Sequence, residues 1–172
     1  DKSTIYRTAV KADGTGLDTP VVAAELPDGE IVRSVQGYLG FILIGTDKGI
    51  RFASPDSSGN LTLGGLIDDA TEVRCFEGQG PFVWFGWSQY DGTSTGLGRL
   101  DLGTFNGSKP AYASDLMATE DGDVLSVVTF QGVRVFTVSA DGVFAEETDK
   151  VAGGTIELGR ITYGLSDDKV SL

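Results

Sequence analysis

The sequence contains no histidine. Histidine is the commonest general base and metal ligand in proteins, so its absence excludes every Ser-His and Cys-His catalytic relay. A mechanism that uses two carboxylates stays open, because glycosidases work with Asp and Glu alone. Cysteine is almost absent too: Cys75 is the only one, so the chain can form neither an internal disulfide nor a thiolate metal cluster. We expect Cys75 to be a small buried hydrophobic residue of a strand, and we expect no cofactor.

Long apolar runs and positive charge are also scarce. No run approaches the roughly 20 apolar residues of a membrane helix. The first residues, Asp1 to Thr4, contain neither an initiator methionine nor a signal-peptide pattern, which predicts that this end results from a cut or from processing. The chain has 25 acidic and 13 basic residues, a net charge of −12. Such a surface repels phosphate groups, so we expect no nucleic acid partner and no membrane insertion.

Glycine, by contrast, is abundant: 25 of the 172 residues are glycine, about twice the usual share of roughly 7%. The glycines separate short runs of β-branched and aromatic residues, each about as long as a strand. No window keeps a helical period. The clearest runs are 41–44, 82–85, 124–128, 133–136 and 161–163. This pattern predicts an all-β protein.

The runs recur with a long period. Phe41 and Phe82 open similar runs 41 residues apart, and Leu125 follows Val83 after 42 residues. A second series of similar strands carries an arginine in each member: Arg7, Arg51, Arg99 and Arg134. A repeating unit of roughly 40–50 residues that holds four short strands is typical of a β-propeller blade. We therefore predict a β-propeller built from four-stranded antiparallel blades.

The predicted blades divide the chain, taken as one domain over 1–172, into five units. Three full units are expected at 31–67, 73–116 and 118–151, with partial units at 5–26 and 156–172. The partial units could complete each other in a four-bladed ring, or the chain could be a segment of a larger propeller. The segment is favoured because Asp168-Lys169-Val170 matches Asp47-Lys48-Gly49-Ile50, the expected start of a third strand.

Several stretches resemble one family of proteins. They are 45–52, 75–78, 82–87, 96–102, 112–116 and 159–165, and the likeness extends from about Leu26 onward. Together they resemble the minor tail proteins of siphophages, the long-tailed bacteriophages, of actinobacteria. The resemblance implies a non-catalytic structural component of the virion tail tip. It implies other tail proteins and further copies of the chain as partners, with a host-surface glycan as an additional candidate.

Two functions of other classes stay open beside this one. The first is a lectin-like propeller that binds carbohydrate, which would need equivalent aromatic pockets in several blades. The second is a glycan-cleaving enzyme with paired carboxylates. The neighbouring acidic pairs do not favour the enzyme, because adjacent residues of a strand point to opposite faces. We therefore expect no enzymatic activity.

The candidate contact site for a glycan or a protein partner consists of Trp87, Tyr90 and Asp91. Exposed aromatic rings beside an acidic turn are suited to stacking on a sugar. The competing interpretation is that Trp87 fills the space between adjacent blades, as large side chains do between packed sheets.

Two further polar features have both a functional and a structural interpretation. The four arginines could line a ligand ring or could pair with carboxylates of nearby turns, and we favour pairing. Asp121-Gly122-Asp123 and 56–60 offer oxygens suited to calcium. Neither has the full spacing of a calcium loop, so plain hairpins are expected.

Overall fold

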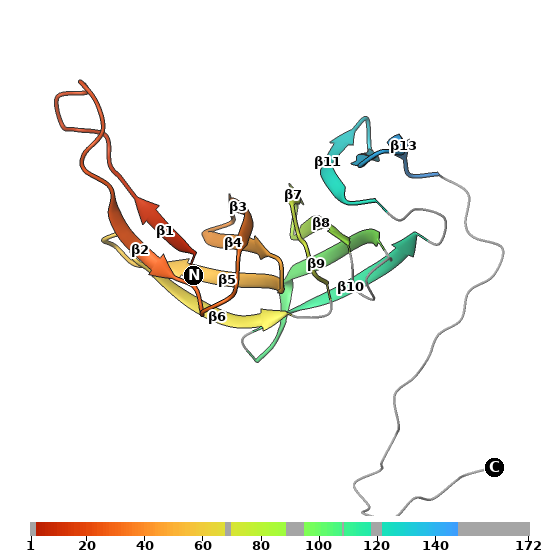
Figure 1. The fold of residues 1–172 in the computed structure, drawn as a ribbon, viewed down its shortest axis with the longest axis horizontal. Coiled ribbons are helices and arrows are strands. Elements are labelled where there is room, and N and C mark those ends of the chain that lie inside the picture. The colour runs from red at the N-terminus through yellow and green to blue at the C-terminus, as the bar shows by residue number, and fades with distance from the viewer. Residues whose placement is uncertain (1–2, 68–69, 89–94, 108, 118–121, 148–172) are drawn as a thin grey trace, which may run out of the picture.

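The computed structural model describes residues 3–67, 70–88, 95–107, 109–117 and 122–147. Within these ranges thirteen strands form four antiparallel sheets without any helix, which confirms the predicted all-β class. Figure 1 shows the sheets following one another along an open arc in the order of the sequence. No sheet in this part of the chain closes on itself. The same residues include no helix able to cross a bilayer.

We number the sheets I to IV in chain order. In each sheet consecutive strands are neighbours. Sheet I contains β1 (Thr4–Arg7) and β2 (Val21–Glu25), and sheet II contains β3 (Val32–Tyr38), β4 (Phe41–Thr46), β5 (Gly49–Pro55) and β6 (Leu61–Ile67). Sheet III contains β7 (Cys75–Gln79), β8 (Phe82–Ser88), β9 (Thr95–Asn106) and β10 (Lys109–Met117), and sheet IV contains β11 (Val124–Phe130), β12 (Val133–Val138) and β13 (Gly142–Ala145). The predicted unit 156–172 lies outside the described residues.

The first hairpins of sheets II, III and IV turn through equivalent two-residue loops. Leu39 and Gly40 have φ angles of 48° and 83°, and Gln131 and Gly132 have 51° and 82°. In sheet III, Gly80 takes the first loop position with a φ of 59°. Such loops suit the right-handed twist of the strands that they join, and glycine adopts positive φ without steric cost. When the three loops are taken as equivalent, the first two strands of sheets II, III and IV correspond to one another.

This comparison shows that the strand equivalences predicted from the sequence repeat are wrong after residue 118. Leu125 lies on β11, the first strand of its sheet, whereas Val83 lies on the second strand β8, so their predicted equivalence is wrong. Arg134 lies on the second strand β12, while Arg51 and Arg99 lie on the third strands β5 and β9. Neighbouring strands share the same two-residue alternation, and an apolar pattern alone therefore does not reveal a shift by one strand.

The sheets pack against each other through their apolar faces. Between sheets II and III, the side chains of Leu43, Ile50, Val83 and Phe85 are all 0% exposed. Burial of a side chain of this size contributes about 1.5–3 kcal/mol to stability. A smaller cluster joins sheets III and IV, and another joins sheets I and II. Their buried members are Val124, Val127, Phe136 and Val138 in the first case and Leu26, Ile44 and Ala53 in the second.

Glycine permits the closest approach between sheets. Gly45 on β4 lies directly against Val73, the residue that leads into sheet III. A β-carbon at position 45 would overlap the carbonyl oxygen of Val73 and the hydroxyl of Ser34. Gly86 on β8 lies in the same way against Val124, which opens sheet IV. Both glycines therefore act as contact points between one sheet and the next.

We expect Gly45→Ala to lower the free energy of unfolding by about 1–3 kcal/mol, because the backbone of Val73 has to move away. Urea unfolding followed by tryptophan fluorescence measures the change. Gly16→Ala is the matched control, since a β-carbon at Gly16 meets no atom within 4 Å. Equal stabilities of the two variants would contradict the proposed close contact.

Candidate functional site

The structure places one of the three predicted contact residues. Trp87 lies on β8, and its side chain is 4% exposed within the core between sheets II and III. The buried indole has no open face on which a sugar could stack, in agreement with the interpretation that Trp87 is a packing residue. Tyr90 and Asp91 lie outside the described residues. The structure therefore does not bring the three residues together as a site.

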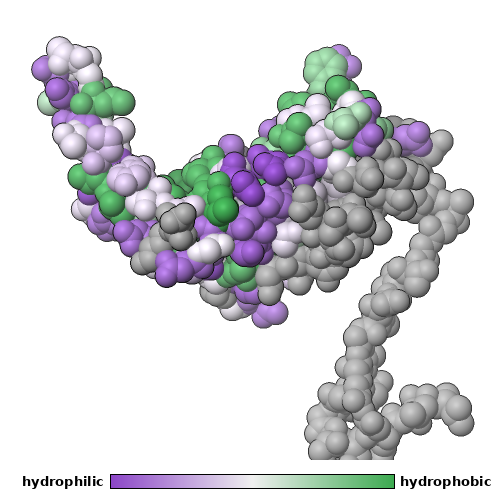
Figure 2. All heavy atoms as spheres, in the orientation of Figure 1, coloured by the Kyte–Doolittle hydropathy of each residue, from purple (hydrophilic) through white to green (hydrophobic). Residues whose placement is uncertain are grey.

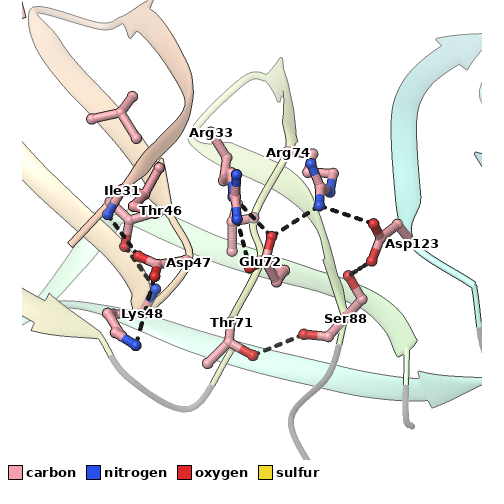
Figure 3. Close-up of polar contacts among 12 residues, drawn as sticks. Ile31, Arg33, Thr46, Asp47, Lys48, Thr71, Glu72, Arg74, Ser88 and Asp123 are labelled. Atoms are coloured by element: carbon pink, nitrogen blue, oxygen red, sulfur yellow. Dashed lines mark hydrogen bonds and ion pairs between the residues drawn. The ribbon is translucent and has the colours of Figure 1, made fainter. Parts of the chain in front are cut away.

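A different group of polar residues crosses from sheet to sheet (Figure 3). We call Arg33, Glu72, Arg74 and Asp123 the charged ladder. Arg33 lies on β3, Glu72 and Arg74 lie on the segment entering β7, and Asp123 directly precedes β11. The ladder therefore joins sheets II, III and IV at one end of their first strands.

The contacts of the ladder are short and continuous. Arg33 donates from Nε and Nη2 to the two carboxylate oxygens of Glu72, at 2.9 and 3.0 Å. Arg74 Nη2 lies 3.0 Å from Glu72 Oε2 and 2.9 Å from Asp123 Oδ2. Hydrogen bonds to Glu72 raise the pKa of Arg33 above its usual value. The carboxylate of Glu72 thus holds two guanidinium groups from different sheets.

Glu72 has an unusual backbone conformation. Its φ angle is 50°, in the left-handed region that is unfavourable for residues with a side chain. Its side chain is 13% exposed, whereas those of its two arginine partners are each 30% exposed. This backbone turns the carboxylate between Arg33 and Arg74, and the two ion pairs offset the conformational cost.

In sheets II, III and IV, hydrogen bonds fasten the start of the sheet to the end of its second strand. In sheet II, Asp47 Oδ1 accepts a bond from Ile31 N at 2.7 Å, and Asp47 N donates to Ile31 O at 3.0 Å. In sheet IV, Asp123 N donates to Ser139 Oγ and Ser139 N donates to Asp123 O, both at 2.8 Å. We call this arrangement the entry clasp.

Sheet III contains the same clasp and links it to the ladder. Ser88 N donates to Thr71 O at 3.0 Å, and Thr71 Oγ1 donates to Ser88 O at 2.8 Å. Ser88 Oγ also donates to Asp123 Oδ1 at 2.9 Å, which connects the end of β8 to the start of sheet IV. Figure 3 shows these bonds beside the ladder. Asp123 therefore belongs to both networks.

The recurring arginines have structural partners rather than a shared ligand site. Arg51 donates to both oxygens of Glu30 at 2.7–2.9 Å, and Glu30 is 3% exposed. Arg51 also donates to the carbonyl of Gly64 at 3.1 Å. Arg7 donates from Nε to Asn60 Oδ1 at 3.3 Å. Arg51 thus pairs with a carboxylate near its strand, in line with the favoured interpretation, whereas the partner of Arg7 is the side-chain amide of Asn60.

The other two arginines both lie close to one aromatic ring, that of Trp84. The guanidinium carbon of Arg99 is 5.5 Å from the ring centroid of Trp84, and that of Arg134 is 3.8 Å from it. Arg134 also pairs with Glu146. Cation–π contacts of this kind stabilise by about 0.5–2 kcal/mol when partly buried. Trp84 is thereby fixed between sheets III and IV.

Three of the acidic residues considered for calcium or catalysis, Asp56, Asp123 and Glu146, are engaged within the fold. Asp56 accepts hydrogen bonds from Ser58 N and Asn60 N at 2.8 Å and from Asn60 Nδ2 at 2.9 Å. These bonds, that from the Asn60 side chain above all, hold the pKa of Asp56 below its usual value. Among the residues that the structure describes, no three His, Cys, Asp or Glu side chains are placed to hold a metal ion. Of the acidic pairs considered for calcium or catalysis, Asp68, Asp69, Asp121, Asp167 and Asp168 lie outside the described residues.

The ladder connects sheets II, III and IV by polar contacts. Each described charge of the ladder is held by a group from a neighbouring sheet or segment. We did not predict from the sequence that Arg33, Glu72 and Arg74 form ion pairs. The charges of opposite sign in Glu72-Val73-Arg74, directly before a strand, are a signal of such pairs. That signal becomes informative once the sheets are known to stack with their first strands side by side.

No protein-family model matches the chain, and a search of curated proteins returns no significant match. A function for the protein therefore has to follow from its sheets and its polar contacts, together with the sequence pattern.

We expect Glu72→Gln to lower the free energy of unfolding by about 1–2 kcal/mol, because two partly buried arginines lose their shared counter-charge. Urea unfolding at low salt measures the effect. Asp28→Asn removes one negative charge from an exposed position and serves as the matched control. A loss of similar size in the control would assign the effect to net charge and not to the ladder.

Cys75 should react slowly with alkylating reagents. Burial raises the pKa of its thiol to about 11, and its Sγ lies 3.9 Å from the carbonyl oxygen of Val124. At pH 8 we expect alkylation about a hundredfold slower than that of an exposed cysteine, since the thiolate is the reactive form. Lys11→Cys in a Cys75→Ser background provides the exposed reference, and mass spectrometry follows both rates. Similar rates for the two thiols would contradict the burial of Cys75.

Proposed function

We propose that the chain is a non-catalytic β-propeller segment that serves as a structural module of a phage tail tip. The observation that carries this proposal is the repetition of one sheet-to-sheet contact. Sheets II and III have the same strand order. In each of them a glycine of the second strand contacts the valine at the start of the next sheet, Val73 on Gly45 and Val124 on Gly86. Repetition of one rotation between similar sheets is how a propeller is generated.

The contacts between the sheets support a rigid scaffold. Apolar clusters fill the spaces between successive sheets, and the charged ladder joins the same ends of three of them. The polar residues with catalytic or ligand-binding interpretations serve as clasps, ion pairs or turns wherever the structure describes them. A scaffold of this kind holds its loops in fixed positions for binding by other subunits.

The setting in a phage tail is supported by the sequence. The described stretches that resemble minor tail proteins coincide with strands and turns of sheets II and III, such as Gly45–Phe52 and Gly96–Leu102, while 159–165 lies outside the described residues. Other tail proteins and further copies of the chain are the proposed partners, and the proposed location is the virion. A host-surface glycan is the further proposed ligand, which the module would meet when the tail tip reaches the host.

The proposal requires that a phage genome encodes the chain, and it is tested on virions of that phage. Antibodies raised against the purified protein should label the tail tip in immuno-electron microscopy, and mass spectrometry of purified virions should detect its peptides. Antibodies depleted on the purified protein serve as the control. Absence of the protein from virions would overturn the tail role. Binding to a glycan array by a chain absent from virions would favour the lectin instead.

A further inference from the structure

One face of sheet IV is apolar and exposed. The opposite face packs on sheet III through Val127 and Phe136. We call the exposed side the outer face, and by the cross-strand register it comprises Ser126, Val128, Phe130, Val133, Val135, Thr137, Val143 and Ala145. Val128, Phe130 and Val143 are 49%, 62% and 71% exposed. Figure 2 shows hydrophobic side chains on this end of the arc.

The equivalent positions of sheet II are covered. Thr137 pairs with Val143 in sheet IV as Gly45 pairs with Ile50 in sheet II. Ile50 is 0% exposed because sheet III lies over it, while Val143 is 71% exposed. The outer face of sheet IV therefore matches a face that the fold elsewhere uses for packing. An exposed apolar face of this kind marks a contact surface.

Sheet II receives its neighbour at one particular pair of residues. Ser34 on β3 lies opposite Gly45 on β4, and Val73 packs onto this pair with 0% exposure. Ser34 Oγ donates a hydrogen bond to the carbonyl oxygen of Val73 at 2.9 Å. We call two such opposed residues a receiving pair and the incoming valine an entry residue.

Sheet III repeats this arrangement with different residues. Cys75 on β7 lies opposite Gly86 on β8, and Val124 packs onto this pair with 0% exposure. The thiol of Cys75 lies 3.9 Å from the carbonyl oxygen of Val124. The first residue of the receiving pair thus carries a side-chain donor in both sheets, and in both the entry residue is a fully buried valine.

Sheet IV presents a third receiving pair. Ser126 on β11 lies opposite Thr137 on β12, at the position that Ser34 and Gly45 occupy in sheet II. Thr137 has a side chain where Gly45 and Gly86 have none, so an entry residue would lie farther from this pair than Val73 and Val124 lie from theirs. Their hydroxyl groups lie 2.9 Å apart in an exposed contact. Either hydroxyl can turn to donate to an incoming carbonyl group instead, as Ser34 does.

We propose that the outer face of sheet IV is a docking face for the C-terminal segment of this same chain, with Val170 as the entry residue on Ser126 and Thr137. Val73 follows the first residue of β5 by 24 residues (73 − 49), and Val124 follows the first residue of β9 by 29 (124 − 95). Val170 follows the first residue of β13 by 28 (170 − 142). Val170 lies outside the described residues, so this assignment rests on the two precedents and the spacing.

Three other β-branched aliphatic residues follow sheet IV in the sequence, namely Val151, Ile156 and Ile161, and the sequence alone starts the next unit near Ile156. They follow Gly142 by 9, 14 and 19 residues (151 − 142, 156 − 142 and 161 − 142), fewer than either observed spacing. The stretch Ile156-Glu157-Leu158-Gly159-Arg160-Ile161 resembles Leu61-Thr62-Leu63-Gly64-Gly65-Leu66 of β6. Since β6 precedes the entry residue Val73, this resemblance also favours an entry residue after Ile161, which is Val170. The inference rests on the propeller part of the proposed function, but not on the phage setting.

The test exchanges the cysteine between two receiving pairs in the full chain. Cys75→Ser places in sheet III the residue found in sheet II, and Ser126→Cys moves the thiol to the third pair. Docking of Val170 predicts that the thiol introduced by Ser126→Cys is alkylated at least about tenfold more slowly than the thiol introduced by Lys11→Cys in the same background. Equal rates for the two thiols would overturn the proposal, even if the protein proves to be a virion component.

The occupant is identified by a second substitution and by dilution. Val170→Asp should raise the alkylation rate of the thiol at position 126 about tenfold, whereas the matched control Val170→Ile should leave it slow. Circular dichroism and the urea midpoint show whether sheets I to IV remain folded. Protection that survives about a hundredfold dilution assigns the occupant to the same chain. Protection lost on dilution would assign the face to a second copy, and protection that persists in Val170→Asp would overturn the role of Val170.

Discussion

Burial of one apolar sheet face against the next is the interaction on which the rest of this structure depends. A single sheet of three or four short strands has two apolar faces and covers neither of them by itself. The close contact at Gly45 and Gly86 lets successive sheets approach until their side chains interlock. The fully buried residues Leu43, Ile50 and Val83 lie where two sheets meet, so stability belongs to the interfaces and not to single sheets.

The polar networks follow from this packing. Stacking brings the starts of the first strands together, which places Arg33, Glu72, Arg74 and Asp123 within reach of one another. Partly exposed ion pairs contribute little energy each, but they fix the rotation of one sheet relative to the next. The acidic surplus of the sequence therefore includes carboxylates that position arginines between sheets.

The sequence could predict the features that depend on residues close together in the chain. The all-β class follows from strand propensity, and the hairpin at 56–60 follows from residues that tolerate positive φ, such as Gly59. Leu125 and Arg134 were matched to the wrong strand of the repeating unit, because neighbouring strands carry the same alternation of apolar and polar residues. The charged ladder and the burial of Trp87 depend on which faces meet, and that information lies in contacts between residues far apart in the chain.

The order of the strands has a consequence for how the protein is made. Within each described sheet, every strand pairs with a strand next to it in the sequence, and each later sheet packs on the one before it. A chain whose sheets are completed in the order of the sequence can fold as it leaves the ribosome, one hairpin after another. Each finished sheet then serves as the template for the next, and the newest outer face stays exposed and prone to association until the following segment has been synthesised.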